Sequence, residues 1–85
     1  MRIKVAGKYW DFRFVTNLGK NVGWVNYTTH QIRIKKGQSE HEELDTVIHE
    51  LLHAAHEHHN EEVTEGTARD LADTLWKLGW RKTSR

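Results

Sequence analysis

The apolar residues change their spacing about halfway along the chain, and this change constrains the fold more than any other feature of the sequence. Between residues 2 and 36, apolar and polar residues alternate in short runs separated by segments rich in Gly and Asn, which is typical of half-buried strands. From residue 44 onward, apolar residues recur every three or four positions, which is typical of amphipathic helices. The sequence therefore predicts an α+β fold, with a small antiparallel sheet of three or four strands over residues 1–38 and two helices over residues 39–80.

Capping residues indicate where both helices begin and where the second ends. Ser39, followed three positions later by Glu42, fits a capping box, so we expect the first helix over residues 40–57. Asn60 is a favourable N-cap for the second helix, and Gly79 suits the left-handed position that follows a helix. An apolar stripe on the second helix would allow it to pack on the first. This stripe consists of Ala68, Leu71, Ala72, Leu75 and Leu78.

The composition excludes several classes of protein. The chain has 85 residues, of which 36% are apolar, and it contains no Cys. A chain of this length builds one core, so we expect residues 1–85 to form a single domain. Without Cys there can be neither a disulfide framework nor a thiolate zinc site. The absence of an apolar run of about 18 residues and of a signal peptide favours a cytoplasmic protein without a membrane partner.

Charge and histidine are concentrated in one part of the sequence. The formal net charge of +1 predicts no particular affinity for nucleic acid. The distribution is uneven, however, because residues 1–40 carry +6, residues 41–65 carry −8 and residues 66–85 carry +3. Six of the seven histidines lie in the acidic segment. A solvated acidic helix would explain the charge alone, whereas the histidines in addition favour a segment that attracts a cation.

The acidic segment contains a His-Glu-x-x-His motif at residues 49–53. His49 and His53 are four positions apart, so on a helix they share one face and both imidazoles can reach a single Zn²⁺ ion. Glu50 can approach a zinc-bound water rather than the metal and act as its general base. A histidine-rich solvated helix face would show the same spacing, but these histidines flank an apolar stripe and can face the second helix. The motif therefore predicts a catalytic zinc site.

A third protein ligand has to come from the residues after His53, because a catalytic zinc site holds three protein ligands and a water. His59 has the spacing of the motif HExxHxxGxxH, although His56 stands at its glycine position. His56 itself lies about two helical turns beyond the first histidine of the motif, too far to share one ion easily. Glu61 and Glu65 share a face of the second helix and can look back at the first. We favour Glu61, with Glu65 and His59 as alternatives.

The sequence around the motif also carries a family resemblance. The motif lies in the segment LDTVIHELLHA at residues 44–54, and a Glu-Glu pair follows at residues 61–62, then ARDLA at residues 68–72 and LGWR at residues 78–81. Together these segments resemble small metallopeptidase-like proteins encoded by bacteriophages. More broadly the chain is similar to minimal gluzincins and to SprT-like and ImmA-like zinc peptidase domains, although it lacks the Asn-Glu-x-x-Ser-Asp signature of gluzincins.

The resemblance implies a zinc-dependent peptidase with a zincin-like minimal domain, in which a small sheet supports an active-site helix and a second helix supplies a ligand. His49 and His53 would bind Zn²⁺, and Glu61 or Glu65 would complete the site. Glu50 would be the catalytic base. The host-cell cytoplasm would be the location of a phage-encoded enzyme of this kind.

A peptide or protein is the expected substrate, whereas nucleic acid is not expected as a partner. A peptide would add as a strand to an exposed sheet edge, for which residues 32–36 are the candidate. Tyr27, His30 or Arg33 could stabilise the oxyanion if their hairpin overhangs the site. The competing hypothesis is a non-catalytic domain that zinc stabilises and that binds a protein or nucleic-acid partner. Its support is the small size of the chain, which leaves little room for a substrate cleft.

Overall fold

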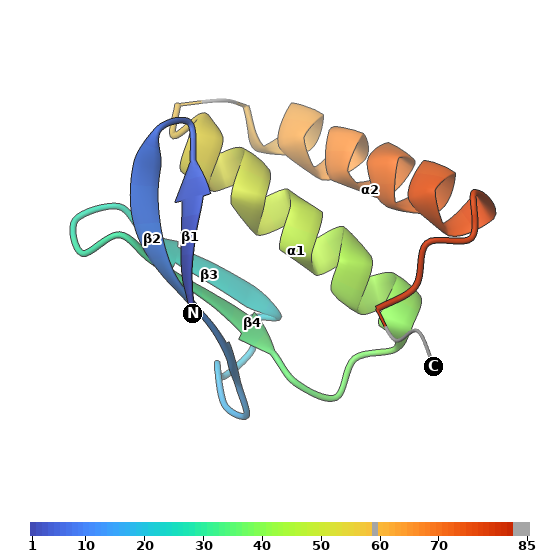
Figure 1. Cartoon of the computed structure of the whole chain (residues 1–85), viewed down its shortest axis with the longest axis horizontal. Coiled ribbons are helices and arrows are strands. Elements are labelled where there is room, and N and C mark those ends of the chain that lie inside the picture. Colours follow the sequence, from blue (N-terminus) through green and yellow to red (C-terminus); the bar gives the residue numbers. More distant parts are fainter. Residues whose placement is uncertain (59, 83–85) are drawn as a thin grey trace.

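The described part of the chain contains four strands followed by two helices (Figure 1). The structure is a computed structural model that describes residues 1–58 and 60–82. This order of elements confirms the predicted α+β class. The elements are β1 (Arg2–Val5), β2 (Lys8–Val15), β3 (Gly23–Asn26), β4 (Gln31–Lys35), α1 (Glu40–Ala55) and α2 (Glu61–Lys77).

The four strands form a mixed sheet in the order β1-β2-β4-β3, so the prediction of an antiparallel sheet is wrong. β1–β2 and β3–β4 are antiparallel pairs, but β2 and β4 run parallel. β4 occupies the centre of the sheet because its Ile32 and Ile34 are both fully buried there, where apolar side chains lose the most contact with water. At this position it lies next to β2 and runs parallel to it. Residues 32–35 of the proposed substrate edge therefore lie in an interior strand, and the two edges of the sheet are β1 and β3.

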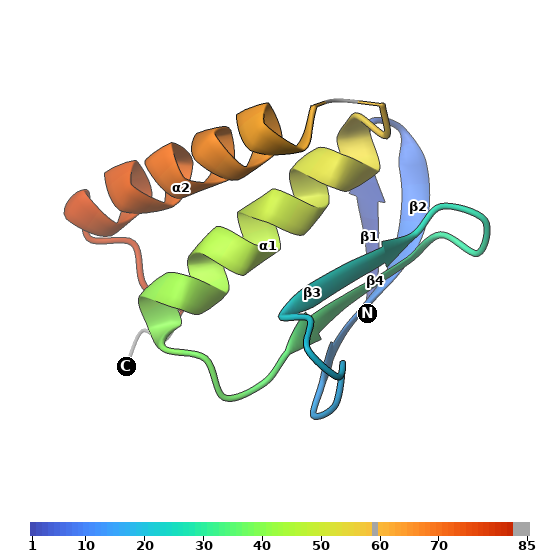
Figure 2. The same cartoon turned by 180° about the vertical axis from the view of Figure 1, so that it is seen from behind.

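One face of the sheet holds the core. Trp10 and Phe12 of β2 join the two β4 isoleucines there, and Val47 and Leu51 of α1 pack against this cluster. Figures 1 and 2 show that both helices lie on this side of the sheet, with α1 next to the strands and α2 beyond it. The opposite face of the sheet is turned away from both helices.

The caps of both helices form as predicted. The Ser39 side chain accepts a hydrogen bond from the Glu42 backbone N–H, and the Asn60 side chain accepts from the first backbone N–H groups of α2. Gly79 follows α2 with a φ of +94°, which glycine adopts without strain. α1 ends at Ala55, two residues before the predicted limit. No helix of the described residues is long and apolar enough to cross a membrane.

The buried residues of α2 have small side chains, and Trp76 near its end packs on His41 of α1. Thr64, Ala68 and Ala72 are buried, and their size lets the two helix backbones approach closely. Leu71 and Leu78 belong to the predicted apolar stripe, but they are 43% and 70% exposed. The contact between the helices is therefore narrower than the sequence pattern indicates.

Candidate metal centre

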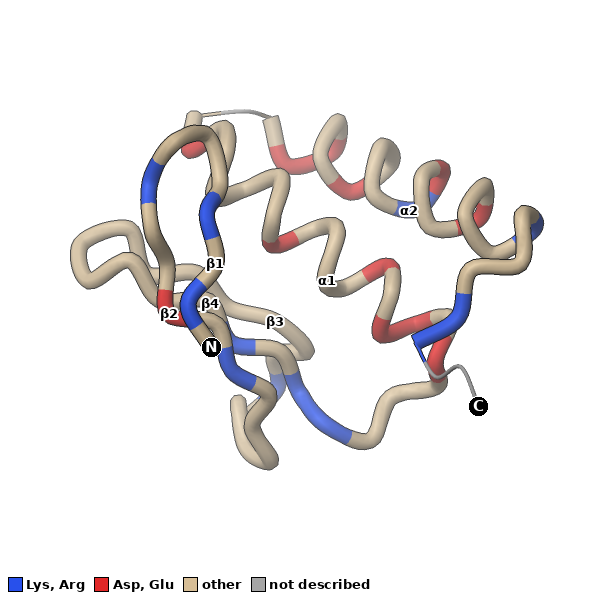
Figure 3. The backbone as a smooth tube through the Cα atoms, viewed as in Figure 1, with Lys and Arg blue, Asp and Glu red and all other residues tan. Residues whose placement is uncertain are grey.

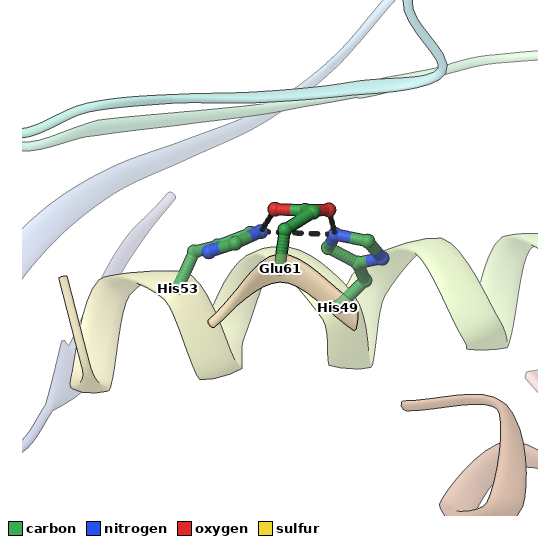
Figure 4. A group of neighbouring side chains, drawn as sticks. All are labelled: His49, His53 and Glu61. Carbon is green, nitrogen blue, oxygen red and sulfur yellow. Dashed lines mark hydrogen bonds and ion pairs between the residues drawn. The ribbon is translucent and has the colours of Figure 1, made fainter. Parts of the chain in front are cut away.

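Two histidines of α1 and the first residue of α2 converge on one point (Figure 4). The Nε2 atoms of His49 and His53 lie 2.9 Å apart. One carboxylate oxygen of Glu61 lies 2.9 Å from His49 Nε2, and the other lies 2.8 Å from His53 Nε2. Helical spacing brings the imidazoles together, while the turn after α1 returns the chain so that Glu61 faces them.

The close approach of these three groups suits a cation between them. If both Nε2 atoms carry hydrogens, each N–H can donate to its own Glu61 oxygen, but the two nitrogens stay within 2.9 Å of each other. If only one does, the bare nitrogen of the other imidazole faces a carboxylate oxygen with no hydrogen between them. A metal ion would instead accept an electron pair from all three residues.

The donor set of this group fits Zn²⁺. Two imidazole nitrogens and a carboxylate oxygen are the protein ligands of one known type of catalytic zinc site. Tetrahedral zinc with bonds of about 2.0–2.1 Å keeps its ligand atoms about 3.3 Å apart. Small side-chain rotations would open the observed separations to that value.

The three residues line a cleft of about 580 Å³ between β3, α1 and the start of α2. The side chains of His49 and His53 are mostly covered, with 21% and 16% exposed, whereas Glu61 is 62% exposed. An ion held here would thus be fixed from the α1 side and reachable from the cleft. This combination is typical of a site with an open coordination position.

Glu50 lines the same cleft and is buried against β3. Its side chain lies at Gly23, where an added Cβ would come within 2.7 Å of Glu50 Cγ and 2.9 Å of Cδ. Burial raises the pKa of Glu50 to about 6, the charge of His49 lowers it and the charge of Glu61 raises it. A carboxyl group with a pKa nearer to neutrality is suited to taking up and returning a proton.

Gly23 is a site residue that the sequence pattern does not indicate, because it ends a segment rich in Gly and Asn. The available signal was its position beside Trp24 at the start of a strand, because a glycine within a strand often marks a close approach of another group. The missing side chain is what leaves room for the Glu50 carboxyl.

The three residues considered for oxyanion stabilisation lie in different places. Tyr27 lines the cleft, and its hydroxyl donates to the backbone carbonyl of His53 over 3.1 Å. His30 stacks on Trp10, with ring centroids 4.6 Å apart. Arg33 forms an ion pair with Asp11 on the outer face of the sheet. The structure therefore brings only Tyr27 of these three to the cleft.

The alternative third ligands are not part of the converging group. Glu65 lines the cleft, but its carboxylate lies 3.3 Å from Arg69 of the same helix. His59 lies outside the described residues. His56 caps the C-terminus of α1 with its backbone N–H, and His41 packs on Trp76 and pairs with Asp73.

Comparison with models of known protein families, with curated proteins and with solved structures finds no match to this chain. What is established is a small α+β fold with a His49/His53/Glu61 group that could hold a metal ion.

Proposed function

We propose that the protein is a zinc-dependent metallopeptidase. The observation that carries the proposal is the convergence of His49, His53 and Glu61 in a cleft that also contains the Glu50 carboxyl group. The resemblance of the HExxH segment to phage-encoded metallopeptidase-like proteins and gluzincins supports the same assignment.

The proposed roles follow from the positions of the side chains. His49, His53 and Glu61 would hold Zn²⁺, which when bound acts as a Lewis acid and lowers the pKa of its water toward about 7. Glu50 would take up a proton within the cleft and return it to the leaving amine. Its burial against Gly23 keeps the carboxyl group fixed and partly shielded from water.

A peptide substrate would bind beside the edge strand β3. Residues 23–25 of this strand line the cleft, and an edge strand offers unpaired backbone groups to an added strand. Tyr27, which directly follows this strand, is the candidate hydrogen-bond donor to the oxyanion, and its hydroxyl would turn away from the His53 carbonyl to donate there. We therefore place the substrate backbone between β3 and α1.

The test compares zinc binding and hydrolysis in wild type and Glu50→Gln. Purified protein is titrated with Zn²⁺ by calorimetry, and cleavage of a quenched fluorescent peptide library is followed. We expect one zinc per chain in both proteins and a loss of hydrolysis of at least about a hundredfold in Glu50→Gln. The exposed Glu62→Gln is the matched control and should behave as wild type. Loss of zinc in Glu50→Gln would contradict its role as a base.

The third ligand is tested by charge-neutral replacement. Glu61→Gln should weaken zinc binding by about ten- to a hundredfold, whereas Glu65→Gln should leave it nearly unchanged. Equal, wild-type affinity in both variants would return the assignment to His59.

A non-catalytic, zinc-stabilised domain is the second candidate function. The observation that favours it is that His49 and His53 of α1 and Glu61 of α2 form one group, so that a bound metal would join the two helices. Stoichiometric zinc without hydrolysis in wild type would support this function over the first.

A further inference from the structure

The face of the sheet turned away from the helices is basic. Side chains alternate along each strand, so residues that do not join the core lie on this outer face. Five of them within the four described strands are cationic, and one is acidic. The cations are Arg2, Lys4, Arg13, Arg33 and Lys35, and the acid is Asp11.

The structure separates the two signs of charge that nearly cancel in the whole sequence. Figure 3 shows Lys and Arg along the strands and most Asp and Glu along the two helices. A polyanion would therefore be attracted to the outer face of the sheet and repelled by the helices. The net charge of +1 hides this surface, because it sums both sides of the molecule.

Two exposed aromatic side chains lie among these cations. Tyr9 is 51% exposed and Trp24 is 37% exposed. The guanidinium carbon of Arg2 lies 3.9 Å from the centre of the Tyr9 ring, and Lys4 Nζ lies 5.2 Å from it. Trp24 is paired across β3 and β4 with Arg33.

The strand register arranges these groups in a row across the sheet. Arg13 of β2 is paired with Arg33 of β4, which is paired in turn with Trp24 of β3. Asp11 accepts a hydrogen bond from Arg33 over 3.0 Å and pairs with Arg13 over 3.3 Å, so the single acid holds the two guanidinium groups side by side. Cations therefore remain in excess on this face.

We propose that this outer face binds single-stranded nucleic acid. Single strands bind where cations track the phosphates and aromatic rings stack on unpaired bases, and this face presents both on an open sheet. The metal centre lies in the cleft on the helix side, and of the residues named here only Trp24 of the edge strand borders both. The sequence alone does not favour nucleic acid as a partner, because only the strand register brings these cations and aromatic rings to one face.

The test is a fluorescence anisotropy titration of the full chain with a labelled oligothymidylate of about 16 nucleotides. We expect binding at about 50 mM NaCl that weakens steeply by about 200 mM. A duplex of the same length should bind more weakly, because its bases are not free to stack. No binding at the lower salt concentration would overturn the proposal, and so would equal affinity for the duplex.

Two kinds of variant separate charge from stacking. Lys4→Ala and Arg13→Ala should each lower the slope of log K against log [salt] by about 0.7. Tyr9→Ala should weaken binding about fivefold or more at an unchanged slope, and Tyr9→Phe should restore it. Because these side chains are exposed, the thermal midpoint of each variant should stay close to that of wild type.

The matched control is Lys77→Ala, which removes the same charge from the last turn of α2. It should leave oligonucleotide affinity within about twofold of wild type. An equal loss in Lys77→Ala and Lys4→Ala would mean that only overall charge matters and would overturn the proposed face. Binding of anionic lipid vesicles with the same dependence on these variants, but without oligonucleotide binding, would assign the face to a membrane surface instead.

Discussion

Gly23 and Glu50 show how a residue without a side chain can define a site. Their contact leaves no space for a methyl group, since Glu50 Cγ and Cδ would lie within 3 Å of an added Cβ. The carboxyl group is thereby buried beside the candidate ligands, in a position that helix geometry alone does not specify.

We predict that Gly23→Ala displaces the Glu50 carboxyl group. Overpacking of this kind costs about 1–3 kcal/mol of folding free energy, and hydrolysis should fall while zinc affinity stays within about threefold of wild type. Urea unfolding and zinc titration measure the two effects. The double variant Gly23→Ala with Glu50→Asp, whose side chain is shorter, should recover much of the lost stability. An additive loss in the double variant would contradict the contact.

The Asp11 carboxyl group, on the outer face of the sheet, makes the stability of the fold depend on pH. Partial desolvation raises the pKa of Asp11, but hydrogen bonds and charge from Arg33 and Arg13 lower it further, so the pKa lies below its ordinary value of 3.8. A depressed carboxyl pKa stabilises the fold above the unfolded pKa, and this contribution is lost as pH falls through the folded pKa.

We therefore predict that Asp11→Asn lowers the urea midpoint at about pH 7 and that the difference from wild type shrinks at about pH 3. The effect should be small because the group is exposed to solvent. Asp70→Asn, on an exposed position of α2, is the matched control. A difference that grows toward acid pH would be inconsistent with a depressed pKa.

At the scale of elements, the N-cap of α2 positions a candidate metal ligand, because Glu61 is the first residue of this helix. The Oδ1 atom of Asn60 accepts hydrogen bonds from the backbone N–H groups of Glu62 and Val63, over 2.8 and 3.3 Å. These bonds fix the first turn of α2 and with it the backbone of Glu61.

Asn60→Ala should lower the free energy of unfolding by about 1 kcal/mol and weaken zinc binding in parallel. Asn60→Asp should retain both properties, because a carboxylate caps the same N–H groups. Gly66→Ala is a useful counterpart, since nothing lies within 4 Å of its added Cβ and it should strengthen the helix by up to about 1 kcal/mol. Unchanged zinc affinity in Asn60→Ala would mean that Glu61 is held independently of the cap.

At the scale of the whole molecule, the candidate metal centre joins α1 to α2. Elsewhere the two helices meet through the small buried side chains of α2 and through His41 of α1, which stacks on Trp76 and pairs with Asp73. A ligand that binds only the folded state stabilises it in proportion to the logarithm of its concentration. Zinc should therefore act as a cross-link between the outer helix and the rest of the fold.

We predict that free Zn²⁺ at a hundred times its Kd stabilises the protein by about 2.7 kcal/mol. For a chain of this size the corresponding rise in Tm is about 10 °C or more. Differential scanning calorimetry with and without EDTA measures it, and His53→Ala should abolish most of the rise. An equal rise in His53→Ala would place the bound zinc at other histidines.

The sequence alone was sufficient for features that depend on local spacing. The i, i+4 histidines and the caps at Ser39 and Asn60 depend on neighbouring residues, because turns and helices form through short-range hydrogen bonds and side-chain contacts. The α+β class followed from the change of hydrophobic period. Among the candidate ligands on α2, helical spacing could reduce the choice to Glu61 and Glu65 but could not separate them, since both lie on one face.

Tertiary structure decided everything that depends on which segments become neighbours. The parallel pairing of β2 and β4 and the edge position of β3 join separate segments of the chain, and no local pattern encodes the direction of such a pairing. The approach of Glu61 to the imidazoles depends on how α2 packs on α1. The same applies to Gly23 beneath Glu50 and to the basic row from Arg13 to Trp24. Chain packing is cooperative across the whole core, so these contacts are determined only when all elements compete for burial at once.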